Sequence, residues 1–186
     1  MAEARDLIRR VGASALLVVL GLSGISYVAP AAASSPSRCQ ETQIDVDIVS
    51  RGAALGNVGD AIVITNVSSS ACTVTGYPTV RFTGGPGVAA SVARKTLNGY
   101  IGGLGAPGTK LPLPVVTLRA HGGVASSLIE GDDNPVGNAR SCVRYTKVSV
   151  SLPHLSPPYR IATRFPGCVR PQVHPLVKGS DGDSLQ

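Results

Sequence analysis

Four cysteines are the residues of this 186-residue chain with the widest chemical range: Cys39, Cys72, Cys142 and Cys168. They include no close pair such as the CxxC that most zinc sites require. An even cysteine count in an exported chain predicts two disulfides. Three pairings are possible, and proximity in the sequence favours Cys39–Cys72 with Cys142–Cys168. Each bond is expected to stabilise the fold by on the order of 3 kcal/mol, and no thiol is left over as a nucleophile.

The histidines and carboxylates do not form a recognisable catalytic pattern. His121, His154 and His174 lack a second ligand at the i+2 or i+4 spacing of a metal site, so we expect all three on the surface. Asp45 and Asp47 share one strand face, with no third group placed to work with them. A serine hydrolase would need a Gly-x-Ser-x-Gly elbow, which the chain after residue 33 does not contain.

The densest run of oxygen ligands is Glu130-Gly131-Asp132-Asp133-Asn134. Calcium takes six to eight such ligands, but the spacing here differs from that of an EF-hand loop. We interpret the run as an acidic hairpin loop, with a calcium site as the alternative. No metal or other cofactor is predicted.

Residues 1–33 have the layout of a secretory signal peptide. Arg5, Arg9 and Arg10 precede an apolar, uncharged run over residues 11–28, and small residues follow up to Ala33. Cleavage after Ala33 predicts a secreted protein, extracellular or associated with the cell envelope. The alternatives are an uncleaved anchor, since 18 apolar residues approach the length of a membrane span, and twin-arginine export, to which the residues after Arg10 are a poor match.

The charge of the chain is positive and unevenly distributed. The whole chain carries +6, and the part after residue 33 has 14 basic and 9 acidic residues, or +5. Residues 134–179 contain no acid and seven basic residues: Arg140, Arg144, Lys147, Arg160, Arg164, Arg170 and Lys178. This run favours an anionic partner such as an envelope polymer or a lipid headgroup, with a merely solvated surface as the alternative. Nucleic acid is not expected, because the chain is predicted to be exported and its aromatic content is only 4%.

Alternating apolar and polar residues, with 22 glycines and 14 prolines, predict an all-β domain with almost no helix. A turn is expected at residues 56–59, and a loop at 131–138. The expected strand segments are 44–48, 60–65, 72–75, 79–82, 92–95, 115–118, 124–129, 143–152, 159–165 and 169–177. This pattern indicates an antiparallel, immunoglobulin-like β-sandwich of seven to eight strands over residues 34–179, followed by a disordered tail over 180–186.

The segment between Thr83 and Pro114 lacks clear periodicity and contains eight glycines and four prolines. Long loops of this kind are usually functional or disordered. Loops on a rigid sandwich often carry recognition, so Arg94, Lys95 and Tyr100 are candidate ligand contacts. Arg160 and Arg164 are further candidates, from the basic run. The alternative is a long surface loop without a ligand.

Several motifs together resemble a known family. Cys39 is followed by Ile64-Thr65-Asn66, a serine run, and Cys-Thr-Val-x-Gly-Tyr-Pro over residues 72–78. Val116-Thr117-Leu118 then leads to Gly122-Gly123-x-Ala125, and Cys142 and Cys168 precede the last strands. From Cys39 to Val177 the chain resembles the secreted actinobacterial family of domain of unknown function 4232.

The resemblance implies an exported, immunoglobulin-like sandwich, often lipid-anchored, with no established activity and no catalytic residues. This chain lacks the lipid-anchor cysteine, and Ala120-His121 stands where family members often have a proline before the Gly-Gly turn. We expect a non-enzymatic binding or structural protein of the bacterial cell envelope, whose partner is an anionic polymer, a lipid headgroup or another secreted protein. The alternative is a secreted hydrolase, or an accessory domain of one, with its site in the loops. His121 or His154 beside a carboxylate in a deep pocket would favour it.

Overall fold

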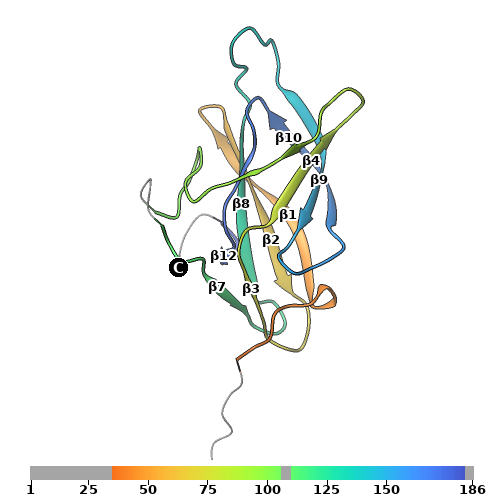
Figure 1. Cartoon of the computed structure of the whole chain (residues 1–186), viewed down its shortest axis with the longest axis vertical. Helices are drawn as coiled ribbons and strands as arrows, with labels where there is room; N and C mark the ends of the chain where they lie inside the picture. Colours follow the sequence, from red (N-terminus) through yellow and green to blue (C-terminus); the bar gives the residue numbers. More distant parts are fainter. Residues whose placement is uncertain (1–34, 106–109, 183–186) are drawn as a thin grey trace, which may run out of the picture. The chain divides into compact units, whose positions relative to one another are not determined.

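The computed structural model describes residues 35–105 and 110–182, which fold as a compact, all-β unit (Figure 1). The predicted signal segment, with its cleavage position, lies outside the described residues, as does the end of the predicted tail. A short 3-10 helix, η1 (Glu41–Gln43), precedes the first strand. The prediction of an all-β, antiparallel sandwich with two disulfides is confirmed.

Twelve strands are present in the described part of the chain, several of them only two residues long. They are β1 (Ile44–Ala54), β2 (Asn57–Asn66), β3 (Cys72–Thr75), β4 (Thr79–Gly84), β5 (Ser91–Val92), β6 (Arg94–Lys95), β7 (Val115–Leu118), β8 (Val124–Asp132), β9 (Val143–Ser151), β10 (Tyr159–Gly167), β11 (Gln172–Val173) and β12 (Val177–Lys178).

A six-stranded sheet has β1, β2 and β8 as its long antiparallel strands. β11 and β12 both pair with the free side of β8, and β6 extends the sheet through a parallel pairing with β11. The β1–β2 hairpin turns at Leu55 and Gly56, whose φ values of 54° and 88° suit a tight hairpin turn. The turn predicted at residues 56–59 is therefore wrong in position, because Asn57 already pairs with Ala54.

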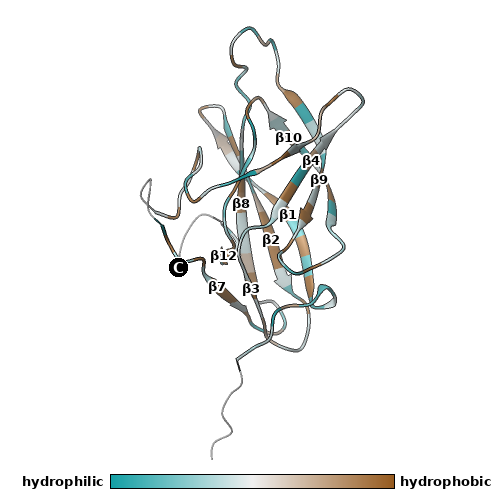
Figure 2. Ribbon diagram, viewed as in Figure 1, coloured by the Kyte–Doolittle hydropathy of each residue, from teal (hydrophilic) through white to brown (hydrophobic). Residues whose placement is uncertain are grey.

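A second sheet has the order β10–β9–β4–β5, and β3 and β7 form a separate two-stranded ribbon. Side chains that alternate along the long strands face a common core, and the apolar bands on the strands are visible in Figure 2. Phe82 is fully buried in this core. The centroid of its ring lies 4.8 Å from that of Phe165 and 5.4 Å from that of Tyr145. Ile62 and Ile129 of the six-stranded sheet belong to the same buried cluster, so the two sheets share one core.

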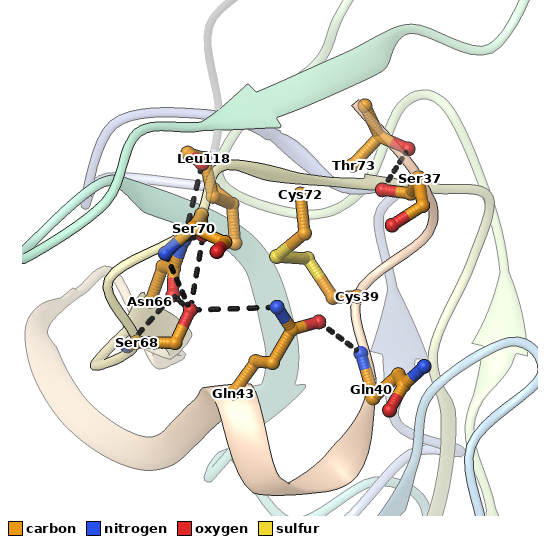
Figure 3. The surroundings of a disulfide bond; sticks show 10 residues. All are labelled: Ser37, Cys39, Gln40, Gln43, Asn66, Ser68, Ser70, Cys72, Thr73 and Leu118. Atoms are coloured by element: carbon orange, nitrogen blue, oxygen red, sulfur yellow. Dashed lines mark hydrogen bonds between the residues drawn. A yellow bond between two sulfur atoms is a disulfide. The ribbon is translucent and has the colours of Figure 1, made fainter. Parts of the chain in front are cut away.

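The first disulfide joins Cys39 to Cys72 and holds the segment before η1 against β3, with a Cα–Cα distance of 4.7 Å (Figure 3). The fully buried Asn66 side chain closes the neighbouring turn. Its Nδ2 donates to the carbonyls of Ser70, at 2.8 Å, and Leu118, at 3.2 Å. Its Oδ1 accepts from the backbone N–H of Ser68 at 2.9 Å. The Thr-Asn and serine-run motif therefore builds the fold, since its polar atoms satisfy buried backbone groups.

The second disulfide joins Cys142, just before β9, to Cys168, just after β10, with a Cα–Cα distance of 4.5 Å. Both pairings are those that sequence proximity favours. Near the C-terminal end of the described chain, Asp181 pairs with Arg51 and the carbonyl of Gly182 accepts from the backbone N–H of Leu128. Asp181 and Gly182, which belong to the predicted disordered tail, thus contact β1 and β8.

Candidate functional site

The structure separates the candidate contact residues into two groups on different sheets. Arg160 and Arg164 are exposed on β10, in the four-stranded sheet. Arg94 and Lys95 form β6, at the edge of the six-stranded sheet, and the Lys95 ammonium lies 5.9 Å from the ring centroid of Tyr77. Of these four residues, Arg160 joins other cations on one surface.

That surface is the outer face of the four-stranded sheet. Arg81 of β4 and Arg160 of β10 both pair with Ser149 of β9, so the three residues form one row across the strands. Their neighbours Val80, Phe82 and Val148 point into the core, which leaves the row on the solvent side. At about 4.8 Å between strands, the two arginine backbones stand roughly 10 Å apart.

Lys147 adds a third cation to this face, two residues from Ser149 on the same strand and paired with Thr83. Arg81, Lys147 and Arg160 line a hollow of about 280 Å³, together with Thr83 and Ser149. We call these five residues the basic face. Charged and hydroxyl donors arranged in this way suit the oxygens of a phosphate or a carboxylate.

In the part of the chain that the structure describes, no acidic side chain pairs with a cation of the basic face. The strands β4, β5, β9 and β10 contain no aspartate or glutamate. Within residues 35–105 and 110–182, no ion pair involves Arg81, Lys147 or Arg160. The edge of the sheet gains a further cation, because Nε of Arg170 donates to the carbonyl of Val92, which pairs with Arg81. Cations this close repel one another, so a bound anion would relieve repulsion as well as gain attraction.

Arg81 is the cation of this face that sequence reasoning missed. It precedes the acid-free run by more than fifty residues, and its only signal is its position between two core residues, Val80 and Phe82. Alternation predicts that its side chain is exposed, but the β4–β9 pairing is needed to place it beside Lys147.

A second cluster lies beneath the loop that carries Tyr100. The Tyr100 side chain is 40% exposed, as expected of a contact residue. Its backbone N–H, however, donates to the carboxylate of Glu130 in β8. Ile101 and Gly102 donate to the same carboxylate at 3.3 and 3.0 Å. The loop is therefore anchored by its own backbone amides.

His174 completes this buried cluster. Its Nε2 lies 3.3 Å from Oε1 of Glu130, and both side chains are fully buried. Burial raises the pKa of Glu130, but contact with His174 and the N–H groups of Gly102 and Tyr100 outweigh it and hold that pKa below its usual value. The three backbone N–H donors of the loop thus favour the ionised form of the buried Glu130 carboxylate.

Two predictions are wrong here. His174 is expected on the surface but is buried, because the chain after β11 packs against β8: its backbone N–H donates to the carbonyl of Leu128. Glu130 is expected in an exposed acidic loop, but β8 continues to Asp132 and the Glu130 side chain is buried beneath the Tyr100 loop. His121 and His154 are exposed, as predicted. No group of three or more potential metal ligands occurs among the described residues.

Comparison with known sequences identifies the family. A profile described as domain of unknown function DUF4232 matches residues 39–175. The chain belongs to the DUF4232 family. The match begins at the first disulfide cysteine and ends one residue after His174, so it includes both the basic face and the Glu130–His174 cluster of this DUF4232 domain. Neither the comparison with curated proteins nor that with solved structures returned a significant match.

The covalent structure agrees with an extracellular or secreted DUF4232 protein, because disulfides persist in oxidising compartments. Over residues 35–105 and 110–182, no helix has the length and apolar character needed to cross a membrane.

Proposed function

We propose that this DUF4232 domain is a non-enzymatic binding module of the bacterial cell envelope, which contacts anionic polymers through its basic face. The observation that carries the proposal is the row of Arg81, Ser149 and Arg160, with Lys147 beside it, on a sheet without acidic residues. Arginine offers several N–H donors in a planar fork that fits phosphate and carboxylate groups.

A polymer suits this surface better than a small anion. The three cations are exposed and line a hollow on an open sheet face, which leaves room for a chain to extend beyond a single bound group. A chain of repeated anionic groups makes several weak contacts at once, and linked contacts raise the overall affinity. Such binding must weaken as salt screens the charges.

The test is binding to a phosphodiester polymer, poly(glycerol phosphate), measured by calorimetry at low and high salt. We expect charge reversal at Arg81→Glu with Arg160→Glu to lower the affinity at least tenfold at low salt, whereas Arg38→Glu with Lys110→Glu, the same change in charge away from this face, has a small effect. Neutral dextran should not bind. Equal losses in the two double variants would show attraction by net charge alone and would refute a dedicated face.

Vesicles distinguish a polymer from a lipid headgroup as the source of the anion. We expect weaker retention on phosphatidylglycerol vesicles than on the polymer, and none on phosphatidylcholine. Stronger binding to the anionic vesicles, again lost in the Arg81 and Arg160 variant, would assign the face to lipid instead.

A secreted hydrolase is the competing function, and the Glu130–His174 pair is the observation in its favour, because acid–base catalysis commonly uses these residue types. Both side chains are buried, and the carboxylate already accepts backbone N–H groups from the Tyr100 loop. These contacts support a structural role for the pair. Hydrolysis of an ester, peptide or glycoside substrate that disappears in a folded His174→Gln variant would overturn the non-enzymatic proposal.

A further inference from the structure

The ribbon of β3 and β7 has a free edge whose direction follows from the hydrogen bonds of Thr73. The N–H of Thr73 donates to Ser37 at 2.8 Å, and its carbonyl accepts from Cys39 at 3.0 Å. In a strand, the two polar backbone groups of one residue point the same way, and those of its neighbours point the opposite way. Cys72 and Val74 therefore direct their backbone groups toward β7.

The pairing of β3 with β7 extends this alternation. Cys72 pairs with Leu118 and Val74 with Val116, so these two β7 residues use their backbone groups on β3. Thr117, between them, directs its N–H and C=O away from the ribbon, as does Val115. Neither takes part in a strand pairing on that side within the described residues.

Strand β12 provides the opposite wall. Gly179 donates its N–H to the carbonyl of Val124 in β8 at 3.2 Å, and Val177 pairs with Ser126 in the same alternation. The backbone groups of Lys178, between them, consequently point away from β8. Figure 1 shows β12 drawn between β8 and β7.

Two adjoining hollows of about 500 and 270 Å³ lie along this edge and share Thr117, Arg119 and Lys178 in their walls. Val116 and Val177 give the first an apolar floor, and Val115 on its rim is 68% exposed. Arg119 and Lys178 are exposed cations, and among the residues that the structure describes no acidic one lines either hollow. We call this feature the β7 groove.

We propose that the β7 groove binds an extended, acidic peptide segment of another protein, which adds as a strand to the β7 edge and places a carboxylate between Arg119 and Lys178. The backbone N–H and C=O groups of Val115 and Thr117 supply the pairing, and apolar side chains of the guest pack against the exposed Val115 side chain. This is strand addition at a sheet edge, in which the backbone gives affinity and the side-chain contacts give selectivity.

The chemistry of the groove favours a peptide over other occupants. An anionic polymer can use the two cations, but it has no N–H groups for the carbonyls of Val115 and Thr117, which would repel it. A second folded copy would have to bring a whole sheet edge past the wall formed by Val177 and Lys178. A single extended segment matches both the alternating backbone groups and the charge.

The probe is a fluorescein-labelled peptide, acetyl-Thr-Val-Thr-Val-Asp-amide, compared with its Asn counterpart by fluorescence polarisation. We expect the Asp peptide to bind at least tenfold more tightly than the Asn peptide at low salt. Thr117→Pro removes an N–H that faces the groove, at an edge position where proline is tolerated, and is expected to weaken binding about tenfold. An unchanged thermal midpoint verifies that this variant is folded.

Charge variants separate this site from the basic face. Arg119→Glu with Lys178→Glu should abolish the preference for the Asp peptide, whereas Arg81→Glu with Arg160→Glu should leave it intact. Binding of poly(glycerol phosphate) should be weakened by Arg81→Glu with Arg160→Glu and should be kept in Arg119→Glu with Lys178→Glu. A negative result at one site therefore leaves the proposal for the other site standing.

Backbone methylation of the peptide keeps the proposal testable even where Thr117→Pro does not fold. N-methyl groups on the alternate peptide residues whose N–H groups face β7 should abolish binding. N-methyl groups on the residues between them, whose N–H groups face away from β7, should leave binding unchanged. Equal binding of both methylated peptides would overturn strand addition. Two other outcomes would overturn the peptide proposal. A dimer that is detected by sedimentation and dissociated by Thr117→Pro would assign the groove to a second copy of the chain. Perturbation of the backbone amides of the groove by the polymer alone would assign the groove to a polyanion.

Discussion

Replacing Glu130 by glutamine tests whether the buried carboxylate holds the Tyr100 loop. The carboxylate uses both oxygens: Oε2 accepts from the N–H of Tyr100, and Oε1 accepts from Ile101 and Gly102 at 3.3 and 3.0 Å. Glutamine keeps only one oxygen. With that oxygen in the Oε1 position, the Tyr100 N–H faces an NH₂ group, and a donor left without an acceptor costs about 1–3 kcal/mol.

The loss of charge weakens the remaining bonds as well, since hydrogen bonds to an ionised acceptor are roughly twice as strong as neutral ones. Together these effects predict that Glu130→Gln lowers the free energy of unfolding by about 3 kcal/mol at neutral pH. For a domain of this size, the thermal midpoint should fall by roughly 6–12 °C. Urea unfolding followed by circular dichroism measures the change, since the chain contains no tryptophan.

The pH dependence gives the sharper result. The pKa of Glu130 is lowered in the folded state, because the contact with His174 and the loop amides outweigh burial. Its contribution to stability is therefore complete above the usual glutamate pKa of about 4.3 and is lost as the pH falls through the lower, folded-state value. The difference between wild type and Glu130→Gln should shrink from neutral pH to about pH 3.

Asp47→Asn provides the control, because Asp47 is exposed on β1. Its stability should stay within about 0.5 kcal/mol of wild type. A Glu130→Gln variant as stable as this control at neutral pH, or a stability difference that does not change with pH, would refute the role of the carboxylate as the anchor of the loop.

Three further changes test other parts of the same fold. In Gly99→Ala the added carbon would lie 1.6 Å from Oε2 of Glu130, so the loop must shift. The stability measured by calorimetry should therefore fall by about 2 kcal/mol. Gly85→Ala is the control and should change stability little, because no atom lies within 4 Å of the added carbon. Asn66→Ala removes a buried side chain that makes hydrogen bonds of 2.8 to 3.2 Å to backbone groups. The free energy of unfolding, measured in urea, should fall by about 3 kcal/mol. A loss no larger than that of the exposed Val67→Ala would contradict a structural role for Asn66. Joint replacement of Cys39 and Cys72 by serine opens a link across 33 residues and should lower stability by about 3 kcal/mol, with peptide mapping still showing Cys142 bonded to Cys168.

The strands that lie near a turn or a cysteine were the most predictable. Val115–Leu118 and Cys72–Thr75 have the predicted bounds, because apolar residues alternate between glycines and prolines that end each strand. Both disulfides follow sequence proximity. β8 was predicted too short, because its buried end at Glu130 is polar and looks like a loop.

The candidate site was predictable only in part. Arg160 and Lys147 stand out in an acid-free run, but Arg81 and the free edge of β7 do not. The side chain of Tyr100 stays a predicted ligand contact, but the bond from its backbone N–H to Glu130 was not predicted. A backbone donor has no sequence signature, since every residue except proline carries one.

The sequence alone determined the all-β class, the two disulfides and the alternation that puts Arg160 in solvent and Phe82 in the core. These depend on local periodicity and on cysteine spacing. Only the tertiary structure decided that Arg81 joins Arg160 through Ser149, that Glu130 meets His174, and that β7 has an edge beside β12 that no strand of the described residues pairs with. Those juxtapositions depend on which strands pair. Segments far apart in the sequence compete for the same backbone partners and buried area, so neighbouring residues do not determine which strands pair.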